Sequence, residues 1–306
     1  MTDRATLRKI VAGVLVPAAF FFLGREIFRN LEQLRSFRWE IRPGLLALSV
    51  VALALVLVWG VVVWRVLLTR VGVEVPFRAL ARAWFLANLS RYIPGVVWQF
   101  VSLAQLGPSA GLAPATIVTS LLVQMGFLLH SAALVGVYLL PLPLAGKLAP
   151  VLPVLRWIMP LSLALVHPAV IRAALRLAGR VTRRPVLEWR TGWLGGVGLL
   201  ALAAGSWVAY GAAFHLFLLS FVELPPSALP AVIAINAIAW IVGYVVFFAP
   251  GGLGFKEAAL ALLLAGFVPG AVAASLALAA RLWTVAGEVL PALLLLRRGS
   301  VPTQDG

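Results

Sequence analysis

Four ionisable side chains interrupt long apolar stretches in the second half of the sequence. Lys256 and Glu257 directly follow a glycine-rich segment, and Arg281 and Glu288 lie in the last apolar stretch. A charge at the centre of a bilayer costs about 2.5 to 3.5 kcal/mol, so four lipid-facing charges would cost about as much as the stability of a whole domain. We therefore expect the four to face one another, water or a ligand.

The spacing of Arg281 and Glu288 puts both side chains on one face of a helix, because seven residues make nearly two turns. It also separates them by about 10 Å along the axis, so they are not expected to form an ion pair directly. Room is left between them for Lys256, Glu257 or a bound polar group. The alternative is structural, with Lys256 and Glu257 reaching an interface and the other two in a charge network.

Two apolar segments are broken by proline and glycine: the first reads RYIPGVVWQ at 91–99 and the second APGGLGFKE at 249–257. Such breaks persist in a membrane only where protein or a water-filled cavity covers the backbone, so they are the best pointers to a site. An arginine fork suits a phosphate, and a helix restarting after Pro-Gly directs N–H groups and its positive dipole end to the same place. The alternative for the first break is an aromatic belt at the membrane interface. The candidate lipid-binding residues are Arg91, Tyr92, Pro94, Gly95, Trp98, Gln99, Pro250, Gly251, Gly252, Gly254, Lys256, Glu257, Arg281 and Glu288.

The rest of the sequence offers little for other chemistry. Gly251 to Gly254 match no phosphate-binding loop, and the three histidines show no metal-ligand spacing. The chain has no cysteine, which excludes disulfides and thiol catalysis. Both aspartates lie at the chain ends, so no Ser-His-Asp set can form. We expect no metal, no cofactor and no hydrolase activity.

The elements that must position these residues are membrane helices. The chain is 62% hydrophobic and only 11% charged, against about 25% charged for a soluble domain, and a span needs about 20 apolar residues. We predict an all-α polytopic membrane protein, a single domain over 1–306, with about eight full transmembrane helices plus broken or re-entrant segments. The expected spans are 10–23, 44–68, 112–140, 151–171, 193–221, 231–249 and 271–296, and the interrupted segments are 80–106 and 255–267.

Three short motifs recur about half a chain apart. Residues 73–76 recur at 222–225, 93–95 at 249–251 and 111–114 at 266–269, at offsets of 149, 156 and 155. We predict two repeats of opposite topology, 1–145 and 146–298, followed by a short cytoplasmic tail at 299–306.

Basic residues set the expected orientation. The formal net charge is +15, and an arginine-rich stretch at 172–190 places that loop in the cytoplasm. Counting outward from it collects fifteen of the 25 basic residues on the same side, with both termini, so the excess charge needs no nucleic acid. The Glu223 loop, Lys147, Arg156 and the segment 25–42 fall outside. We predict that segment 25–42 is a surface amphipathic helix.

The two broken segments resemble the transmembrane domain of the lysylphosphatidylglycerol synthase/flippase family over essentially the whole chain. That family usually has Pro-Gly-Gly-x-Gly-x-Arg-Glu at the second break, so Lys256 stands for the usual arginine and Glu257 matches the acidic position. Arg281 and Glu288 look like the polar positions of its following helix. The first break departs from the better-known members, which puts an aminoacylated lipid cargo in question. Only about ten residues follow Leu296, so aminoacyl transfer by this chain alone is not expected.

The resemblance and the buried charges together predict a lipid flippase or transporter in the cytoplasmic membrane of a prokaryote. Its partners are then membrane lipids, an anionic phospholipid or a lipid-linked intermediate. One alternative is an intramembrane transferase using a polyprenyl-phosphate donor, with Glu26, Glu32 or Glu40 as its external acid. The other is a non-catalytic accessory subunit bound to a synthase. A homo-oligomer is also left open.

Overall fold

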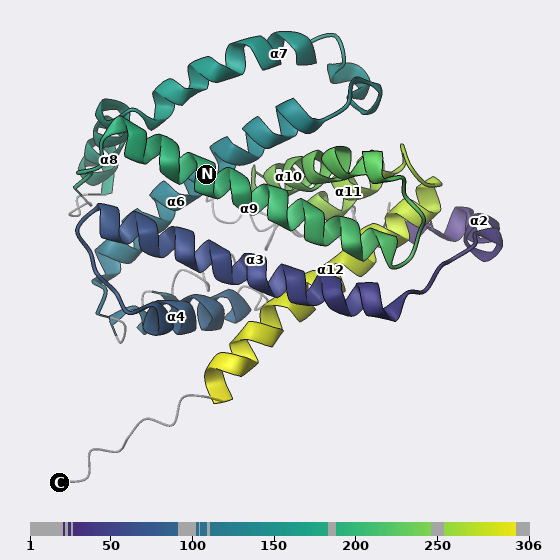
Figure 1. Ribbon diagram of the computed structural model, residues 1–306, viewed down its shortest axis with the longest axis horizontal. Coiled ribbons are helices and arrows are strands. Elements are labelled where there is room, and N and C mark those ends of the chain that lie inside the picture. Colours follow the sequence, from purple (N-terminus) through teal and green to yellow (C-terminus); the bar gives the residue numbers. More distant parts are fainter. Residues whose placement is uncertain are drawn as a thin grey trace, which may run out of the picture.

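The computed structural model describes residues 21, 24, 25, 27–90, 102, 103, 105–108, 111–182, 188–245 and 254–297. Throughout these residues the regular structure is helical, and they contain no strand. The elements in chain order are α2 (Leu31–Ser36), α3 (Pro43–Arg70), α4 (Phe77–Ser90), α6 (Pro114–Leu139), η2 (Leu142–Leu144), η3 (Gly146–Leu148), α7 (Leu152–Ile158), η4 (Met159–Val166), α8 (Pro168–Thr182), α9 (Trp193–Leu219), η5 (Pro226–Ala228), α10 (Leu229–Val245), α11 (Phe255–Leu264) and α12 (Gly270–Arg297) (Figure 1).

Five helices in the described part of the chain are long and apolar enough to cross a membrane, or six if one bent pair counts as a span. The five are α3, α6, α9, α10 with its preceding η5 turn, and α12. The chain is therefore a multi-pass helical protein, as predicted. The predicted count of about eight full spans is not confirmed. The expected first span at 10–23 lies outside the described residues apart from Phe21.

The segment 151–171 is not the single straight span that its composition predicts. It divides into α7, the 3₁₀ helix η4 and the start of α8, and the axis bends by 64° between Val166 and Pro168. Proline lacks the N–H that continues an α-helix. Pro160 is the second residue of η4, and Pro168 is the first residue of α8. The bend thus follows from the positions of the prolines, which the mean hydropathy of the segment does not show.

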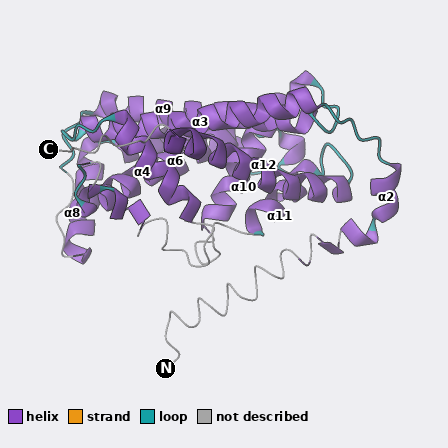
Figure 2. Cartoon of the chain, turned by 90° about the horizontal axis from the view of Figure 1, so that it is seen from below, coloured by secondary structure: helices purple, strands orange, loops and turns teal. Residues whose placement is uncertain are grey.

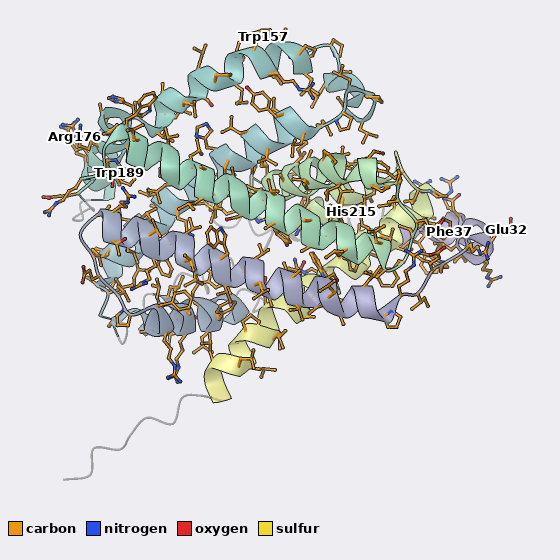
Figure 3. All side chains as sticks on the ribbon, in the orientation of Figure 1. Glu32, Phe37, Trp157, Arg176, Trp189 and His215 are labelled. Carbon is orange, nitrogen blue, oxygen red and sulfur yellow. The ribbon has the colours of Figure 1, made fainter. Side chains whose placement is uncertain are left out.

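Helices α3 and α9 lie antiparallel at the centre of the bundle, and α12 crosses beneath them (Figure 1). At one end the backbone N–H groups of Glu40 and Arg42 donate to the carbonyls of Phe221 and Ser220, both at 3.0 Å. At the other end Thr191 donates to the carbonyl of Arg70 at 3.1 Å. The two ends are visible in Figure 3, with Arg176 and Trp189 at one and Glu32 and Phe37 at the other.

This arrangement corrects the prediction for 25–42. The helical part ends with α2 at Ser36, and residues 37–42 are non-helical and bonded to the end of α9. A row of arginines and glutamates suggested one surface helix, but the backbone bonds to Ser220 and Phe221 compete with helix formation there. The Arg42 guanidinium donates to Glu223 at 3.4 Å, so the segment lies beside the Glu223 loop. Figure 2 shows α2 at one end of the bundle.

Two pairs of recurring motifs lie at opposite ends of the bundle. The loop 73–76 follows α3, whereas 222–225 lies where α3 begins. Leu112 and Val75 belong to one buried cluster at the first end. Gly266 contacts Leu144 at the other, where a Cβ added to the glycine would lie 2.4 Å from Leu144 Cδ2. These placements are the ones that inverted repeats require, and the repeat itself stays a prediction.

Hydrogen bonds from tryptophan indole N–H groups to serine hydroxyls join neighbouring helices. Within the described residues Trp64 donates to Ser120, Trp207 to Ser131 and Trp283 to Ser49, at 3.0, 3.1 and 3.0 Å. Lipid tails are as apolar as leucine, so hydrogen bonds and close packing hold membrane helices together in place of the hydrophobic effect. These pairs join α3 to α6, α6 to α9 and α3 to α12.

We expect Trp283→Phe and Ser49→Ala to be coupled energetically. A double-mutant cycle on unfolding in mixed detergent micelles should give a coupling of about 0.6 to 1.7 kcal/mol, the range for hydrogen bonds between membrane helices. The matched control pairs Trp283→Phe with Ser275→Ala, because among the described residues the Ser275 hydroxyl bonds within its own helix, to the carbonyl of Ala271. Equal couplings in the two cycles would contradict the interhelical role.

Candidate functional site: a charged cluster at the start of a short helix

The short helix α11 starts at a glycine whose backbone conformation other residues rarely adopt. Gly254 has φ of 82°, in the left-handed region that favours glycine. Its N–H donates to Glu257 Oε2 at 2.8 Å. An acidic side chain in the first turn also complements the positive end of the helix dipole. The sequence Gly-x-x-Glu therefore fixes both where α11 begins and where the Glu257 carboxylate points.

Helix α11 folds back along α10. A Cβ added to Gly243 would lie 2.9 Å from Lys256 Cβ, so the end of α10 touches the first turn of α11. The ten residues of α11 are about 15 Å long, half of a hydrocarbon core of about 30 Å. The start of α11 therefore lies well inside the bundle, while its other end returns to the loop at Gly266.

Glu257 forms an ion pair with the last helix. Its Oε1 lies 3.7 Å from Nη1 of Arg281, and the two side chains are 2% and 25% exposed. A buried carboxylate without a countercharge is strongly destabilising, so Arg281 compensates Glu257. The separation exceeds the roughly 2.7 to 2.9 Å of a tight charge-assisted hydrogen bond.

Lys256 turns toward α9 rather than toward a carboxylate. Its Nζ donates to the hydroxyl of Tyr210 at 3.4 Å and lies 5.5 Å from the centroid of that ring, within the reach of a cation–π interaction. Tyr210 packs between two tryptophans, with ring centroids 6.2 Å from Trp207 and 6.0 Å from Trp283. Trp240 adds an edge contact to Trp207 at 4.8 Å.

Glu288 is the fourth of the charged residues that interrupt the apolar stretches. It is 2% exposed and lies about 10 Å beyond Arg281 on the same face of α12. The candidate residues that the structure describes are thus Gly254, Lys256, Glu257, Arg281 and Glu288. The rest of the predicted set lies outside the described residues: Arg91, Tyr92, Pro94, Gly95, Trp98, Gln99, Pro250, Gly251 and Gly252.

Sequence reasoning missed the aromatic neighbours of this cluster. Trp207, Tyr210 and Trp283 sit near the middle of their spans, and Trp240 lies five residues before the end of α10, whereas membrane aromatics usually mark the interfaces. That position is the signal that could have found them. It also missed Asn236, which is 1% exposed in α10 and whose Nδ2 has no hydrogen-bond partner among the described atoms. In the same part of the chain no three metal-ligating side chains come together.

The helices and the buried charges define a class: a multi-pass helical membrane protein with ionisable residues gathered at the start of a short helix inside the bundle. The family model described as the lysylphosphatidylglycerol synthase TM region matches residues 9–292. The chain therefore belongs to that family, as its two broken segments suggested. No curated protein matches the chain in a sequence comparison.

Proposed function

We propose that the protein is a lipid flippase or lipid transporter of a prokaryotic cytoplasmic membrane, moving a phospholipid or lipid-linked precursor between leaflets. The observation that carries the proposal is the Glu257–Arg281 pair at the start of a short helix inside the bundle. Ionisable groups within membrane spans are costly and mark substrate or ion pathways. Membership of a lipid-related membrane family supports the same class of substrate.

The charges suit a headgroup with a phosphate and a cationic part. Lys256 and Arg281 supply positive charge from two different helices, and arginine is adapted to phosphate geometry. Glu257 and Glu288 supply negative charge for a cationic group or for proton exchange. The 3.7 Å separation of Arg281 and Glu257 makes this pair weaker than a tight ion pair, so that a phosphate can compete with Glu257 for the guanidinium.

The test is leaflet exchange of labelled phospholipids in liposomes. We expect Lys256→Ala combined with Arg281→Ala to slow exchange at least tenfold, because a hydrogen bond to a charged group contributes about 1.5 to 3 kcal/mol and 1.4 kcal/mol is a factor of ten. The matched control is Arg78→Ala with Arg190→Ala, which removes the same charge from two exposed positions. Unchanged exchange in the Lys256/Arg281 variant, with a folded protein, would show that the site is wrong.

The same preparation separates the alternatives. Product formation from a labelled polyprenyl-phosphate sugar would indicate the transferase. That function needs an early external acid, and of its candidates Glu40 already forms a salt bridge with Arg42. Stoichiometric copurification with a synthase, with no exchange by the protein alone, would indicate an accessory subunit.

A further inference from the structure

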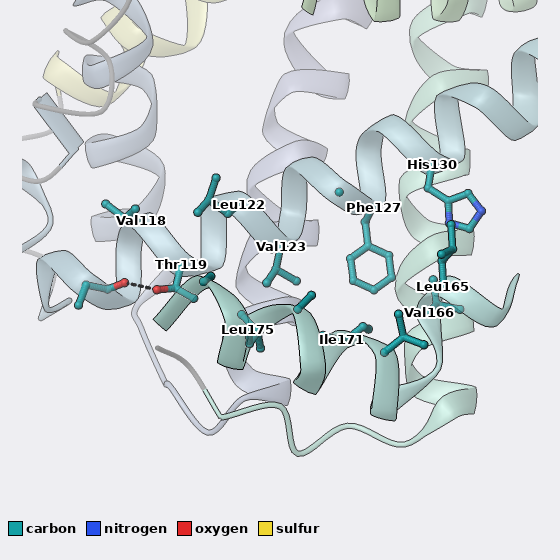
Figure 4. A pocket seen from close by; sticks show the side chains of 15 residues that line it. Val118, Thr119, Leu122, Val123, Phe127, His130, Leu165, Val166, Ile171 and Leu175 are labelled. Carbon is teal, nitrogen blue, oxygen red and sulfur yellow. Dashed lines mark hydrogen bonds between the residues drawn. The ribbon is translucent and has the colours of Figure 1, made fainter. Parts of the chain in front are cut away.

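A groove of about 520 Å³ lies between α6 and the bent segment η4–α8, away from the charged cluster. Figure 4 shows its two walls, with Val123 and Phe127 from α6 facing Ile171 and Leu175 from α8. Its volume falls within the roughly 300 to 1,000 Å³ of small-molecule sites. None of its lining residues comes from α11 or α12, which carry the charged cluster, or from α9 or α10, which supply the aromatic neighbours of that cluster.

The groove presents apolar surface along its length. The polar side chains that line it are already bonded within the protein. Thr119 donates to the carbonyl of Ala115 at 2.7 Å (Figure 4), and His130 Nε2 lies 2.7 Å from Ser162 Oγ. The remaining lining residues are aliphatic, phenylalanine or glycine. A hydrocarbon chain is the ligand class that such walls accept.

The groove is longer than the hydrocarbon of one leaflet. Its α6 wall runs from Ala115 to His130, which is about 22 Å of helix. Half of a hydrocarbon core is about 15 Å. One extended acyl chain of a lipid in a single leaflet therefore fits along it.

The helix that closes the groove carries positive charge on another face. Ile171 and Leu175 of α8 line the groove, while Arg172, Arg176 and Arg180 are exposed at four-residue spacing and so share one side of the helix. No acidic residue occurs in α8. Arginines at a membrane surface attract anionic lipid, so the charge of α8 complements an anionic headgroup, not a zwitterionic one.

The wall formed by η4 is fixed by close packing on α9. A Cβ added to Gly196 would lie 2.7 Å from the carbonyl oxygen of Val166, at the point where the axis bends. The 3₁₀ helix η4 has eight residues, whereas runs longer than three or four are uncommon. The bend that shapes the groove is thus held in place by a glycine on the neighbouring helix.

We infer that this groove is a second lipid site, which holds one acyl chain of an anionic phospholipid with its phosphate at the α8 arginines. The site is separate from the transport cluster and does not depend on transport. Its occupant is a bound lipid that joins α6 to α8.

Native mass spectrometry of the purified full chain tests this site with phosphatidylglycerol and phosphatidylcholine of equal acyl chains. We expect the protein to retain phosphatidylglycerol in preference. Gly126→Leu fills the groove, because a Cβ at Gly126 meets no atom within 4 Å and the residue lines the groove; it should lower retention of phosphatidylglycerol at least fivefold. Gly205→Leu, at an exposed glycine of α9 with equally open surroundings, is the control and should leave retention unchanged.

The arginines are tested separately. Arg172→Gln with Arg176→Gln should lower the preference for phosphatidylglycerol about fivefold or more, whereas Arg70→Gln with Arg190→Gln, exposed at the same end, should leave it unchanged. Equal retention of the two lipids by the unmodified chain would overturn the assignment of an anionic ligand. Retention that survives Gly126→Leu would overturn the groove as the site. A change in oligomeric state with unchanged lipid retention would show instead that a second copy covers the groove.

Discussion

Glu257→Gln should lower the free energy of unfolding by about 3 kcal/mol. The substitution removes the negative charge of Glu257, whose side chain is 2% exposed. That charge faces Arg281, whose side chain is 25% exposed. Removing one partner of a buried ion pair costs about 3 to 5 kcal/mol, and the partial exposure of Arg281 favours the lower end. The amide oxygen still accepts the Gly254 N–H, so the loss reports the charge. Reversible unfolding in mixed detergent micelles measures it.

The matched control is Glu188→Gln. Glu188 pairs with Arg190 at 3.0 Å, but the two side chains are 78% and 70% exposed, and exposed pairs contribute about 0 to 1 kcal/mol. A second variant, Glu257→Ala, also removes the acceptor of the Gly254 N–H, which is buried with it, and should cost about 1 kcal/mol more. If Glu257→Gln and Glu188→Gln change stability equally, the buried pair contributes nothing particular.

Gly211→Ala should destabilise the bundle by about 2 to 3 kcal/mol. An added Cβ would lie 2.5 Å from the Cα and 2.6 Å from the Cγ1 of Ile233, so α9 and α10 must move apart. Overpacking of this kind typically costs about 1 to 3 kcal/mol, and small residues are what let membrane helices approach closely. The obstacle here includes backbone, which places the effect in the upper part of that range.

Gly205→Ala, in the same helix, provides the control for Gly211→Ala. A Cβ there meets no atom within 4 Å, so the change should raise stability by about 0.5 to 1 kcal/mol, the ordinary gain of alanine over glycine in a helix. Opposite signs for the two variants are the expected result. Destabilisation of similar size in both would mean that the α9–α10 contact is looser than the structure has it.

The sequence predicted the long spans well. The expected 44–68, 112–140 and 193–221 became Pro43–Arg70, Pro114–Leu139 and Trp193–Leu219, because a continuous apolar run leaves few other structures available in lipid. It failed at 151–171, where the average composition is equally apolar. Whether prolines bend a span also depends on what packs against the bend, here Gly196 of α9. Gly196 lies in another helix, so the pattern within 151–171 does not contain it.

The candidate site was predictable in its charges and not in its contacts. The cost of charges in lipid is enough, with the sequence alone, to single out Lys256, Glu257, Arg281 and Glu288. Which charge meets which neighbour depends on the relative rotation of α9, α11 and α12, which no single-helix pattern contains. The pairing of Glu257 with Arg281, and of Lys256 with Tyr210, emerged only from the assembled bundle.

The hydrogen bonds between the start of α3 and the end of α9 can form only late in synthesis. The Arg42 guanidinium donates to the carbonyl of Leu219, 177 residues later. At about 5 to 20 residues per second that partner is made roughly 9 to 35 s after Arg42. During this interval α3 resides in the membrane without α9. Of the five long spans α3 is the most apolar, so the helix that must wait for this distant partner is the one best suited to lipid alone.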